Sequence, residues 1–331
     1  MPESFPSLAG SPAPPFHALA PPGGLPGAPV VPGLALRDLV PVHDAPLTHV
    51  WRATGADDEP LTVHVVRAEA HALVPDGERL LSHLATGIGF SGPPLHVPLW
   101  AKRLADGRCA YATRWFDRIP AVDAVRETLL PPAALVETTA NLLASLAELH
   151  RQGSVLGIIG PSSLAYVPEL NTFFVDGAGV FPALLSAGAR REEVARVAGV
   201  PLHIAPEVLV PGAAVDARAD VFSVGTSLYE LLTERAPFGG RTTATMMVSV
   251  LVDTDAEEIA APGGPVRELV DALLRAIERD PDDRWPSAEA FAAAMSGAGR
   301  TTAGPSRRAP GSRSSSLDGW RTLLAQLWGR P

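Results

Sequence analysis

The sequence contains almost no lysine: Lys102 is the only one among 27 basic residues. It also has a single cysteine, Cys109, which excludes an intramolecular disulfide and a cysteine-based metal cluster and fits a reducing compartment. No run of about 18 apolar residues occurs, so we expect no transmembrane segment. The N-terminus has no basic stretch followed by an apolar run, so we expect no signal peptide and a cytoplasmic location.

The charge balance is acidic, because 27 basic and 36 acidic residues give a net charge of −9. This balance argues against a nucleic-acid partner, since such proteins present an excess of basic side chains. The nine histidines are scattered and show no spacing typical of a metal site. Apolar residues make up 46% of the 331 residues, enough for one two-lobed domain with tails.

Both ends of the chain differ in composition from the middle. Residues 1–32 contain ten prolines and no hydrophobic periodicity, which predicts a disordered segment. It is either a spacer or a polyproline ligand. Residues 297–316 are rich in Gly, Ser, Arg and Pro and predict a flexible linker.

The last segment, 317–329, predicts an amphipathic helix, because its apolar residues recur at helical spacing. Three interpretations stay open: docking on the domain, binding to a partner protein, or attachment to a membrane surface. The candidate partner-binding residues are Trp320, Leu324, Leu327 and Trp328.

The middle of the chain, 33–296, changes from strand signals to helix signals. Short β-rich runs with turns fill residues 33–117, with strands expected at 47–53, 61–66, 95–104 and 108–116 and a short helix at 76–86. After Pro131-Pro132 the pattern is mainly helical. We expect a helix that opens at Pro131-Pro132 and ends near Gly153. Further helices are expected at 219–233, 242–251, 265–279 and 287–295, and two short strands at 164–167 and 172–175. The fold class is therefore α+β, with a β-rich N-terminal lobe (33–117) and a helical C-terminal lobe (118–296).

Four ordered motifs in the C-terminal lobe resemble those of the bacterial Ser/Thr protein kinase family, the eukaryotic-like kinase domain. They are Ala205-Pro206-Glu207, the helix start Asp216-Ala217-Arg218-Ala219-Asp220 with Gly225, Ala236-Pro237-Phe238, and Asp280-Pro281-Asp282-Asp283-Arg284. The resemblance implies a two-lobed kinase-like fold over about 34–295. It also implies structural roles for Glu207, Asp220, Gly225 and Arg284, with Glu207 and Arg284 forming a buried ion pair.

The family's catalytic positions are filled by residues that cannot perform the family's chemistry. The three glycine positions of the phosphate-binding loop correspond to His43, Ala45 and Thr48. The position of the strand lysine corresponds to Val66, and the next residue, Arg67, should lie on the other strand face. By the same resemblance, Ile158 occupies the position of the general base, and Gly160 that of the lysine that contacts the substrate phosphate. Ser163 occupies the position of the metal-binding asparagine.

Asp176 is the only catalytic-type residue that survives, in Asp176-Gly177-Ala178, where the family has Asp-Phe-Gly. It follows Ile158 by 18 residues (176 − 158), which is the family's usual spacing. Without an asparagine or a lysine beside it, Asp176 should be a poor Mg²⁺ ligand. We expect it to be a structural turn residue that bonds local backbone.

These losses predict a pseudokinase that binds neither ATP nor Mg²⁺ and acts as a scaffolding or regulatory module. Its partner would be a protein, such as another kinase or a signalling complex. The alternative is an atypical Ser/Thr kinase that keeps ATP binding and phosphotransfer through a rearranged site. That alternative requires Lys102 or an arginine to hold the phosphates.

Overall fold

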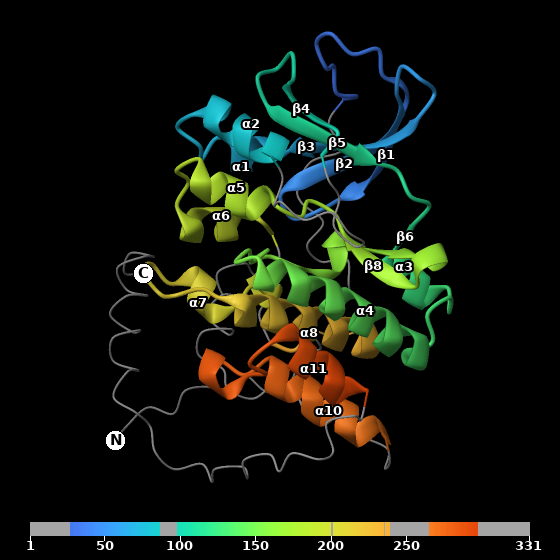
Figure 1. Ribbon diagram of the computed structural model, residues 1–331, viewed down its shortest axis with the longest axis vertical. Helices are drawn as coiled ribbons and strands as arrows, with labels where there is room; N and C mark the ends of the chain where they lie inside the picture. The colour runs from blue at the N-terminus through green and yellow to red at the C-terminus, as the bar shows by residue number, and fades with distance from the viewer. Residues whose placement is uncertain (1–26, 87–97, 200, 235, 239–264, 297–331) are drawn as a thin grey trace, which may run out of the picture. The chain divides into compact units, whose positions relative to one another are not determined.

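The computed structural model describes residues 27–86, 98–199, 201–234, 236–238 and 265–296. Within this part of the chain, a small β-rich lobe precedes a larger lobe of helices, and both belong to one compact unit (Figure 1). The two-lobed α+β, kinase-like fold that the sequence predicts is therefore confirmed. The predicted helices at 242–251 and 317–329 and the linker at 297–316 lie outside the described residues.

The N-terminal lobe is an antiparallel five-stranded sheet with strand order β1-β2-β3-β5-β4. Two helices, α1 and α2, follow β3 and precede β4. The strands are β1 (Arg37–Asp44), β2 (Thr48–Thr54), β3 (Pro60–Val66), β4 (Trp100–Arg103) and β5 (Cys109–Arg114), and the helices are α1 (Ala68–His71) and α2 (Gly77–Thr86).

The two faces of this sheet differ in character because side chains alternate along each strand. One face is an apolar core that contains Trp51, Val63 and Ala112, which are paired across β2, β3 and β5. The opposite face carries the next residues along those strands, among them the buried pair His64 and Tyr111. This second face is rich in polar side chains: Thr48, Thr62, His64, Tyr111 and Thr113.

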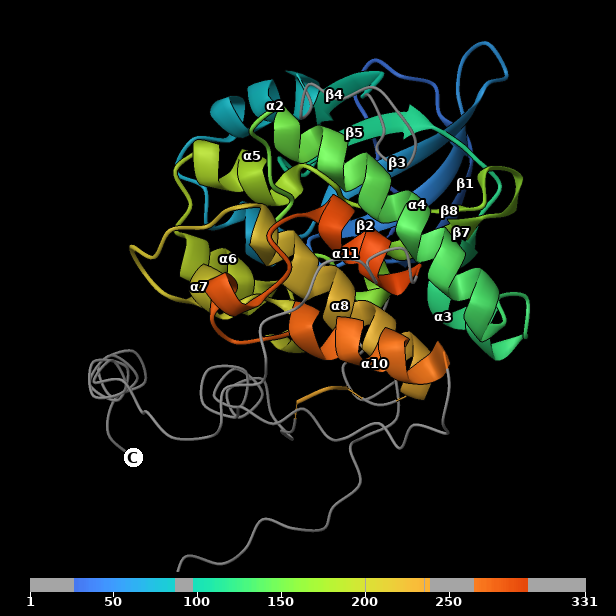
Figure 2. The same ribbon diagram turned by 60° about the horizontal axis from the view of Figure 1, so that its bottom comes forward.

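The C-terminal lobe is built on α4 and α8, against which α10 and α11 pack (Figures 1 and 2). A small sheet, with strand order β6-β7-β8, lies where the two lobes meet. The strands are β6 (Ile119–Pro120), β7 (Leu164–Val167) and β8 (Thr172–Val175). The helices are α3 (Ala121–Arg126), α4 (Pro132–Arg151), α5 (Val180–Ser186), α6 (Arg191–Val197), α7 (Pro206–Leu209), α8 (Ala217–Thr233), α10 (Pro265–Ala276) and α11 (Ala288–Met295).

The core of this lobe explains why α4 and α8 lie at its centre. The inward stripe of α4 contributes Leu142, Leu143 and Leu146, all fully buried. On α8, Gly225 has no side chain, and a Cβ there would lie 2.9 Å from Ala276 Cβ. Because real Cβ atoms do not approach so closely, a glycine at this position allows α8 and α10 to pack together.

Several predicted boundaries agree with the structure, and others differ. The strands at 164–167 and 172–175 match, and the helix after Pro131-Pro132 ends at Arg151, as expected. The strand predicted at 95–104 covers only Trp100–Arg103 within the described residues. Residues 27–32 belong to the lobe rather than to a disordered segment, because Val31 is buried and Val30 O accepts a hydrogen bond from Ala105 N.

Candidate functional site

The loop after α4 is fixed by Asp220, a fully buried residue on α8. Its carboxylate accepts hydrogen bonds from the backbone N–H groups of Leu156 (2.9 Å) and Gly157 (2.6 Å), and from Nε2–H of His150 (2.9 Å). Three donors compensate the burial of one carboxylate. The loop at 156–163 is therefore held by the residue that the sequence singles out as structural.

The side chains at the predicted catalytic-loop positions have no group that could accept a proton from a substrate. Ile158 is apolar and buried, and Gly160 has no side chain. The hydroxyl of Ser163 donates to Gly160 O (2.8 Å) and accepts from Gly160 N (3.0 Å). Ser163 Oγ therefore closes its own turn.

The loop at 45–48, which consists of the link between β1 and β2 and the first residue of β2, lies directly on the turn that follows β8. Ala45 N–H donates to Thr48 O (2.9 Å), and all four loop residues are buried. A Cβ on Gly177, whose φ is +79°, would lie 3.0 Å from Thr48 Oγ1 and 3.8 Å from Ala45 Cβ. The loop that would surround phosphates in a kinase is thus in contact with the Asp176-Gly177-Ala178 turn.

Asp176 forms two buried ionic contacts. Its Oδ1 lies 3.1 Å from Nη2 of Arg118, and its Oδ2 lies 3.1 Å from Nε2 of His43. The side chains of Asp176 and Arg118 are 0% and 1% exposed. The expectation that Asp176 is a turn residue bonding local backbone is therefore wrong: its carboxylate contacts side chains from β1 and from the segment that joins the lobes.

The charge state of Asp176 follows from these neighbours. Burial alone would raise the pKa of the carboxyl. The nearby Arg118 and, to a lesser extent, His43 have a larger effect in the opposite direction, so the pKa lies below its usual range. The pKa of the Tyr111 hydroxyl is raised, because burial and the nearby negative charge of Asp176 both disfavour its ionised form. We therefore treat Asp176 as ionised and Tyr111 as neutral.

Aromatic rings surround this ion pair. His64 and Tyr111 stack with ring centroids 4.6 Å apart and an interplanar angle of 11°. Two guanidinium groups form cation–π contacts with the Trp115 ring: Arg52 Cζ lies 5.1 Å and Arg118 Cζ 5.0 Å from the ring centroid. The polar face of the sheet and the segment that joins the lobes therefore fill the region around Asp176 with the chain's own side chains.

The strand-lysine position carries no charge that could replace the missing lysine. Val66 is fully buried, and its neighbour Arg67 donates to Pro46 O (3.2 Å). Lys102 lies on β4, an edge strand, paired with Ala110. Among the described residues, the ion-pair partners of Asp176 are Arg118 and His43, not Arg67 or Lys102.

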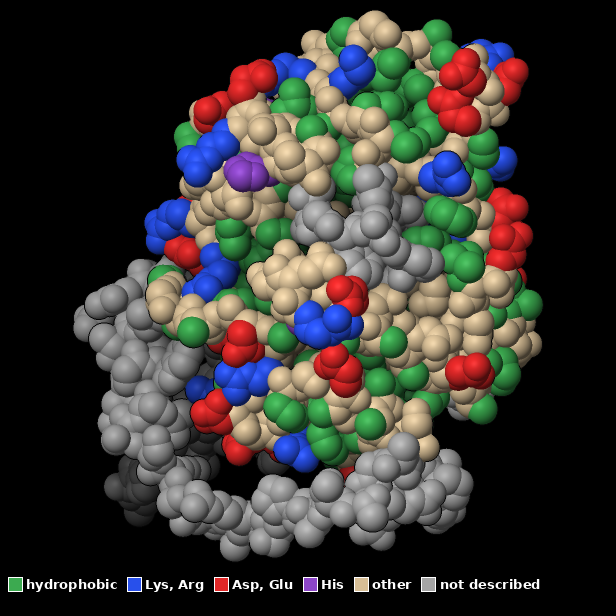
Figure 3. Space-filling model, viewed as in Figure 1, with side chains coloured by type: hydrophobic (Ala, Val, Ile, Leu, Met, Phe, Trp, Pro, Cys, Tyr) green, Lys and Arg blue, Asp and Glu red, His purple; other side chains and the backbone are tan. Residues whose placement is uncertain are grey.

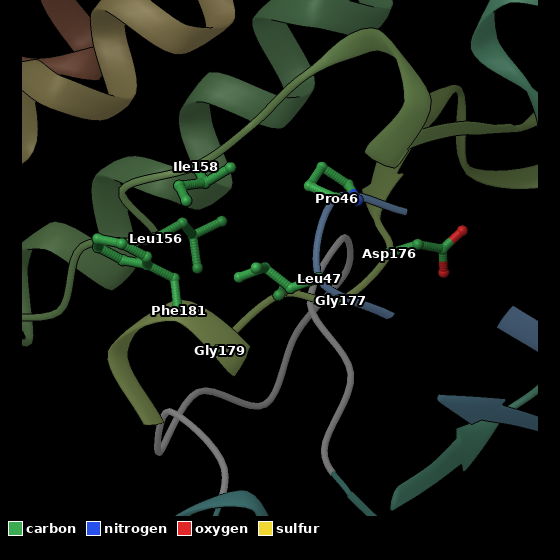
Figure 4. A pocket seen from close by; sticks show the side chains of 9 residues that line it. Pro46, Leu47, Leu156, Ile158, Asp176, Gly177, Gly179 and Phe181 are labelled. Carbon is green, nitrogen blue, oxygen red and sulfur yellow. The ribbon is translucent and has the colours of Figure 1, made fainter. Parts of the chain in front are cut away.

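A small pocket remains beside the loop and the turn (Figure 4). Apolar side chains form most of its wall, and the carboxylate of Asp176 points away from them. The space is about 10 Å³, close to the minimum for one water molecule. Its lining residues are Pro46, Leu47, Leu156, Ile158, Asp176, Gly177, Ala178, Gly179 and Phe181.

The ion pair between Glu207 and Arg284, which the resemblance implies, is present and bidentate. Arg284 Nη1 and Nη2 donate to Glu207 Oε1 and Oε2 at 2.7 and 2.8 Å. The Arg284 guanidinium also donates to three backbone carbonyls, those of Arg218, Glu278 and Arg279. This arrangement links α7, the start of α8 and the segment before α11.

The central residues of the site, Arg118 and His43, were not predicted to act together. The resemblance places His43 at a glycine position of the phosphate-binding loop and predicts no role for Arg118. Arg118 immediately precedes a two-residue strand, a signal too short to indicate where its side chain points. The candidate residues Trp320, Leu324, Leu327 and Trp328 lie outside the described part of the chain.

Metal-binding clusters and membrane-spanning helices are both absent from the described residues. The described residues contain no group of three His, Cys, Asp or Glu side chains arranged to hold a metal ion. None of their helices is both long enough and apolar enough to cross a bilayer. On the face shown in Figure 3, acidic and basic side chains are interspersed in small groups over the described surface.

Relatives of the chain are bacterial protein kinases. It is 34% identical over 164 residues to a probable Ser/Thr protein kinase of Streptomyces coelicolor, SCO3848, covering 48% of this chain and 24% of that protein. It is 31% identical over 187 residues to the Ser/Thr protein kinase PknL of Mycobacterium tuberculosis, covering 56% of this chain and 46% of PknL. The matches thus span less than half of each relative. No protein-family model matches the chain.

Solved structures agree with this relationship at the level of the fold. The PknI kinase domain of M. tuberculosis superposes with a TM-score of 0.59 at 16% identity, over 83% of this chain and 98% of that domain. Together, the sequence relatives, the lobe arrangement and the Glu207–Arg284 ion pair lead to one conclusion. The chain has a protein-kinase-like fold, and about half of it is similar in sequence to bacterial Ser/Thr protein kinases.

Proposed function

We propose that this chain is a pseudokinase: it transfers no phosphate and acts through contact with another protein. The observation that carries the proposal is the buried contact of Asp176 with Arg118 and His43, at 3.1 Å each. The metal-binding aspartate of a kinase must be free to face Mg²⁺ and the phosphates. Here its negative charge is matched by side chains of the chain itself.

The loop at 45–48 supports the same proposal. A kinase loop holds phosphates with backbone N–H groups that glycines leave accessible. In this chain the N–H of Ala45 is bonded to Thr48 O, and the loop packs on Gly177. Phosphates would have to displace both contacts before reaching the turn.

The absence of a base and a phosphate-binding lysine adds to the argument. Ile158 and Val66 offer only apolar groups at those two positions. Loss of a general base alone reduces a rate by about 10²–10⁴-fold. Loss of the charges that stabilise the transferred phosphoryl group reduces it further.

The structural residues support a folded module that works by binding. Glu207, Asp220, Gly225 and Arg284 keep the contacts that hold the helical lobe together. A folded lobe without this chemistry fits a scaffolding or regulatory role in signalling, in the cytoplasm, with a kinase or a signalling complex as partner. The candidate contact residues are Trp320, Leu324, Leu327 and Trp328.

A phosphotransfer assay tests the catalytic half of the proposal. The full chain is incubated with γ-labelled ATP, Mg²⁺ or Mn²⁺ and generic protein acceptors, beside an active bacterial Ser/Thr kinase. We expect no label above background on the chain or on the acceptors. Label incorporation that the Asp176→Ala variant abolishes would instead establish the alternative, an atypical kinase, which the names of the relatives favour.

Cross-linking tests the contact half. The full chain, with and without Trp320→Ala and Trp328→Ala, is cross-linked in cells that express it. We expect a defined adduct with one protein that is a kinase or a component of a signalling complex, and its loss in the double variant. The absence of any adduct, with the chain present at normal level, would contradict a contact function through these residues.

A further inference from the structure

Asp176 lies at the meeting point of three parts of the chain. It follows β8 in the helical lobe, whereas His43 belongs to β1 of the sheet lobe and Arg118 to the segment between the lobes. Arg118 also stacks on Trp115, whose ring receives Arg52 from β2. One carboxylate is thus connected to the sheet lobe by two routes.

Two of these three groups are buried, and the third is largely buried. Asp176 and Arg118 are 0% and 1% exposed, and His43 is 15% exposed. The other groups that face Asp176 are His64 and Tyr111 on the polar side of the sheet.

A charge that loses its partner in such a place must reach water, because an uncompensated buried charge is strongly unfavourable. The loop at 45–48 contacts Gly177, the residue after Asp176, and is bonded to the sheet lobe through Arg67 N, which donates to Leu47 O (3.0 Å). His43 lies two residues before this loop, so the contact of His43 with Asp176 and the contact of the loop with Gly177 lie side by side.

We infer that Asp176, Arg118 and His43 form an interlobe latch, which holds the loop at 45–48 down on Gly177 and keeps the two lobes closed on each other without a nucleotide. In this arrangement the ion pair supplies the bridge between the lobes. The latch does not depend on the contact function proposed above, since it concerns only how the closed form is maintained.

Hydrogen–deuterium exchange of the full chain tests the latch. The Asp176→Asn variant keeps the shape of the side chain but leaves Arg118 unpaired. We expect the amides of Ala45 and Arg67, which report on the loop, to exchange at least about tenfold faster than in the unmodified chain. His43→Gln, at a less buried position, should act at the same amides with a smaller effect.

The matched control is Glu207→Gln, which breaks a buried ion pair within the helical lobe only. It should leave loop exchange unchanged while accelerating exchange around α7. A double variant, Arg118→Met with Asp176→Leu, removes the bridge without leaving an unpaired charge. The loop should therefore exchange more slowly than in Asp176→Asn but still faster than in the unmodified chain.

Three results would overturn the latch. Loop exchange could be unchanged in Asp176→Asn, or it could rise as much in Glu207→Gln, which would indicate general destabilisation. The double variant could also exchange at the loop as slowly as the unmodified chain, which would show that the ion pair is not the bridge. If Asp176→Asn does not fold, His43→Gln and the double variant decide the matter. Phosphotransfer and cross-linking are separate readouts, so failure of the latch and failure of the proposed function are distinguishable.

Discussion

Asp220 on α8 accepts a hydrogen bond of 2.6 Å from the backbone N–H of Gly157, 63 positions earlier in the chain. A second backbone donor, Leu156 N, and the His150 side chain share the same carboxylate. Gly157 needs to be a glycine here, because its φ is +76° and a Cβ would lie 2.5 Å from the Phe181 ring. Asp220 therefore anchors the loop at 156–163, where the resemblance places the catalytic residues of a kinase.

Replacing Asp220 with Asn should weaken this anchor. The amide keeps one acceptor oxygen but loses the negative charge that strengthens all three hydrogen bonds, so we expect a loss of about 1.5–3 kcal/mol in the free energy of unfolding. Asp216→Asn, at the exposed N-cap of the same helix, should change stability by less than about 0.5 kcal/mol, since Asn caps as well as Asp. Urea unfolding measures both, and equal losses would contradict the anchor role.

Glu207→Gln should be more damaging, because it leaves the Arg284 guanidinium buried without a counter-charge. The expected loss in unfolding free energy is about 3–5 kcal/mol. Glu78→Gln removes a similar contact with Arg103, but the Glu78 side chain is 74% exposed and that of Arg103 is 39% exposed. Because water screens this pair, its loss should cost less than about 1 kcal/mol. A loss near zero for Glu207→Gln would show that the buried pair adds nothing to stability.

The stability of the chain should depend on pH through Asp176. Burial works against the charged carboxylate, yet Arg118 and His43 lower its pKa. A lowered pKa in the folded state means that the stabilisation is fully present above the unfolded value of about 3.9 and is lost as the pH falls toward the folded pKa. Asp176→Asn should therefore flatten the acid limb of thermal stability measured between about pH 3 and pH 7. An acid limb that is unchanged in this variant would contradict the assignment.

Cys109 offers a probe of local opening, because it is the only thiol in the chain. It is fully buried on β5, with its Sγ 3.6 Å from His71 Nε2, and burial raises the pKa of the thiol. We expect iodoacetamide to react with the native chain at least about 10²-fold more slowly than with the urea-unfolded chain at pH 8. Equal rates would show that β5 is accessible in the native state.

The helical lobe could be predicted from the sequence far better than the site. Its motifs fix the positions of residues such as Glu207 and Arg284, and their ion pair follows because few other groups can neutralise a buried charge. The long apolar stripe of α4 and the two short strands after it are equally clear, since hydrophobic periodicity marks each of them directly. The short helices α5, α6 and α7 were missed because segments of four to seven residues carry too little periodicity.

The site itself was not predictable residue by residue. The resemblance assigns Val66, Ile158, Gly160 and Ser163 to the catalytic positions, and this assignment stays a prediction. The ion pair of Asp176 could not be predicted, because Arg118 and His43 come from segments 58 and 133 positions away (176 − 118 and 176 − 43). Which of 26 arginines (27 basic residues less Lys102) meets a given carboxylate depends on the packing of the lobes.

Calorimetric titration of the full chain with ATP, with and without Mg²⁺, tests the central claim most directly. The site around Asp176 is filled by the chain's own side chains, so we expect no binding heat at millimolar nucleotide and no metal dependence. Metal-dependent binding that Asp176→Ala abolishes would contradict the account, because Asp176 would then have to leave Arg118 and face the metal ion.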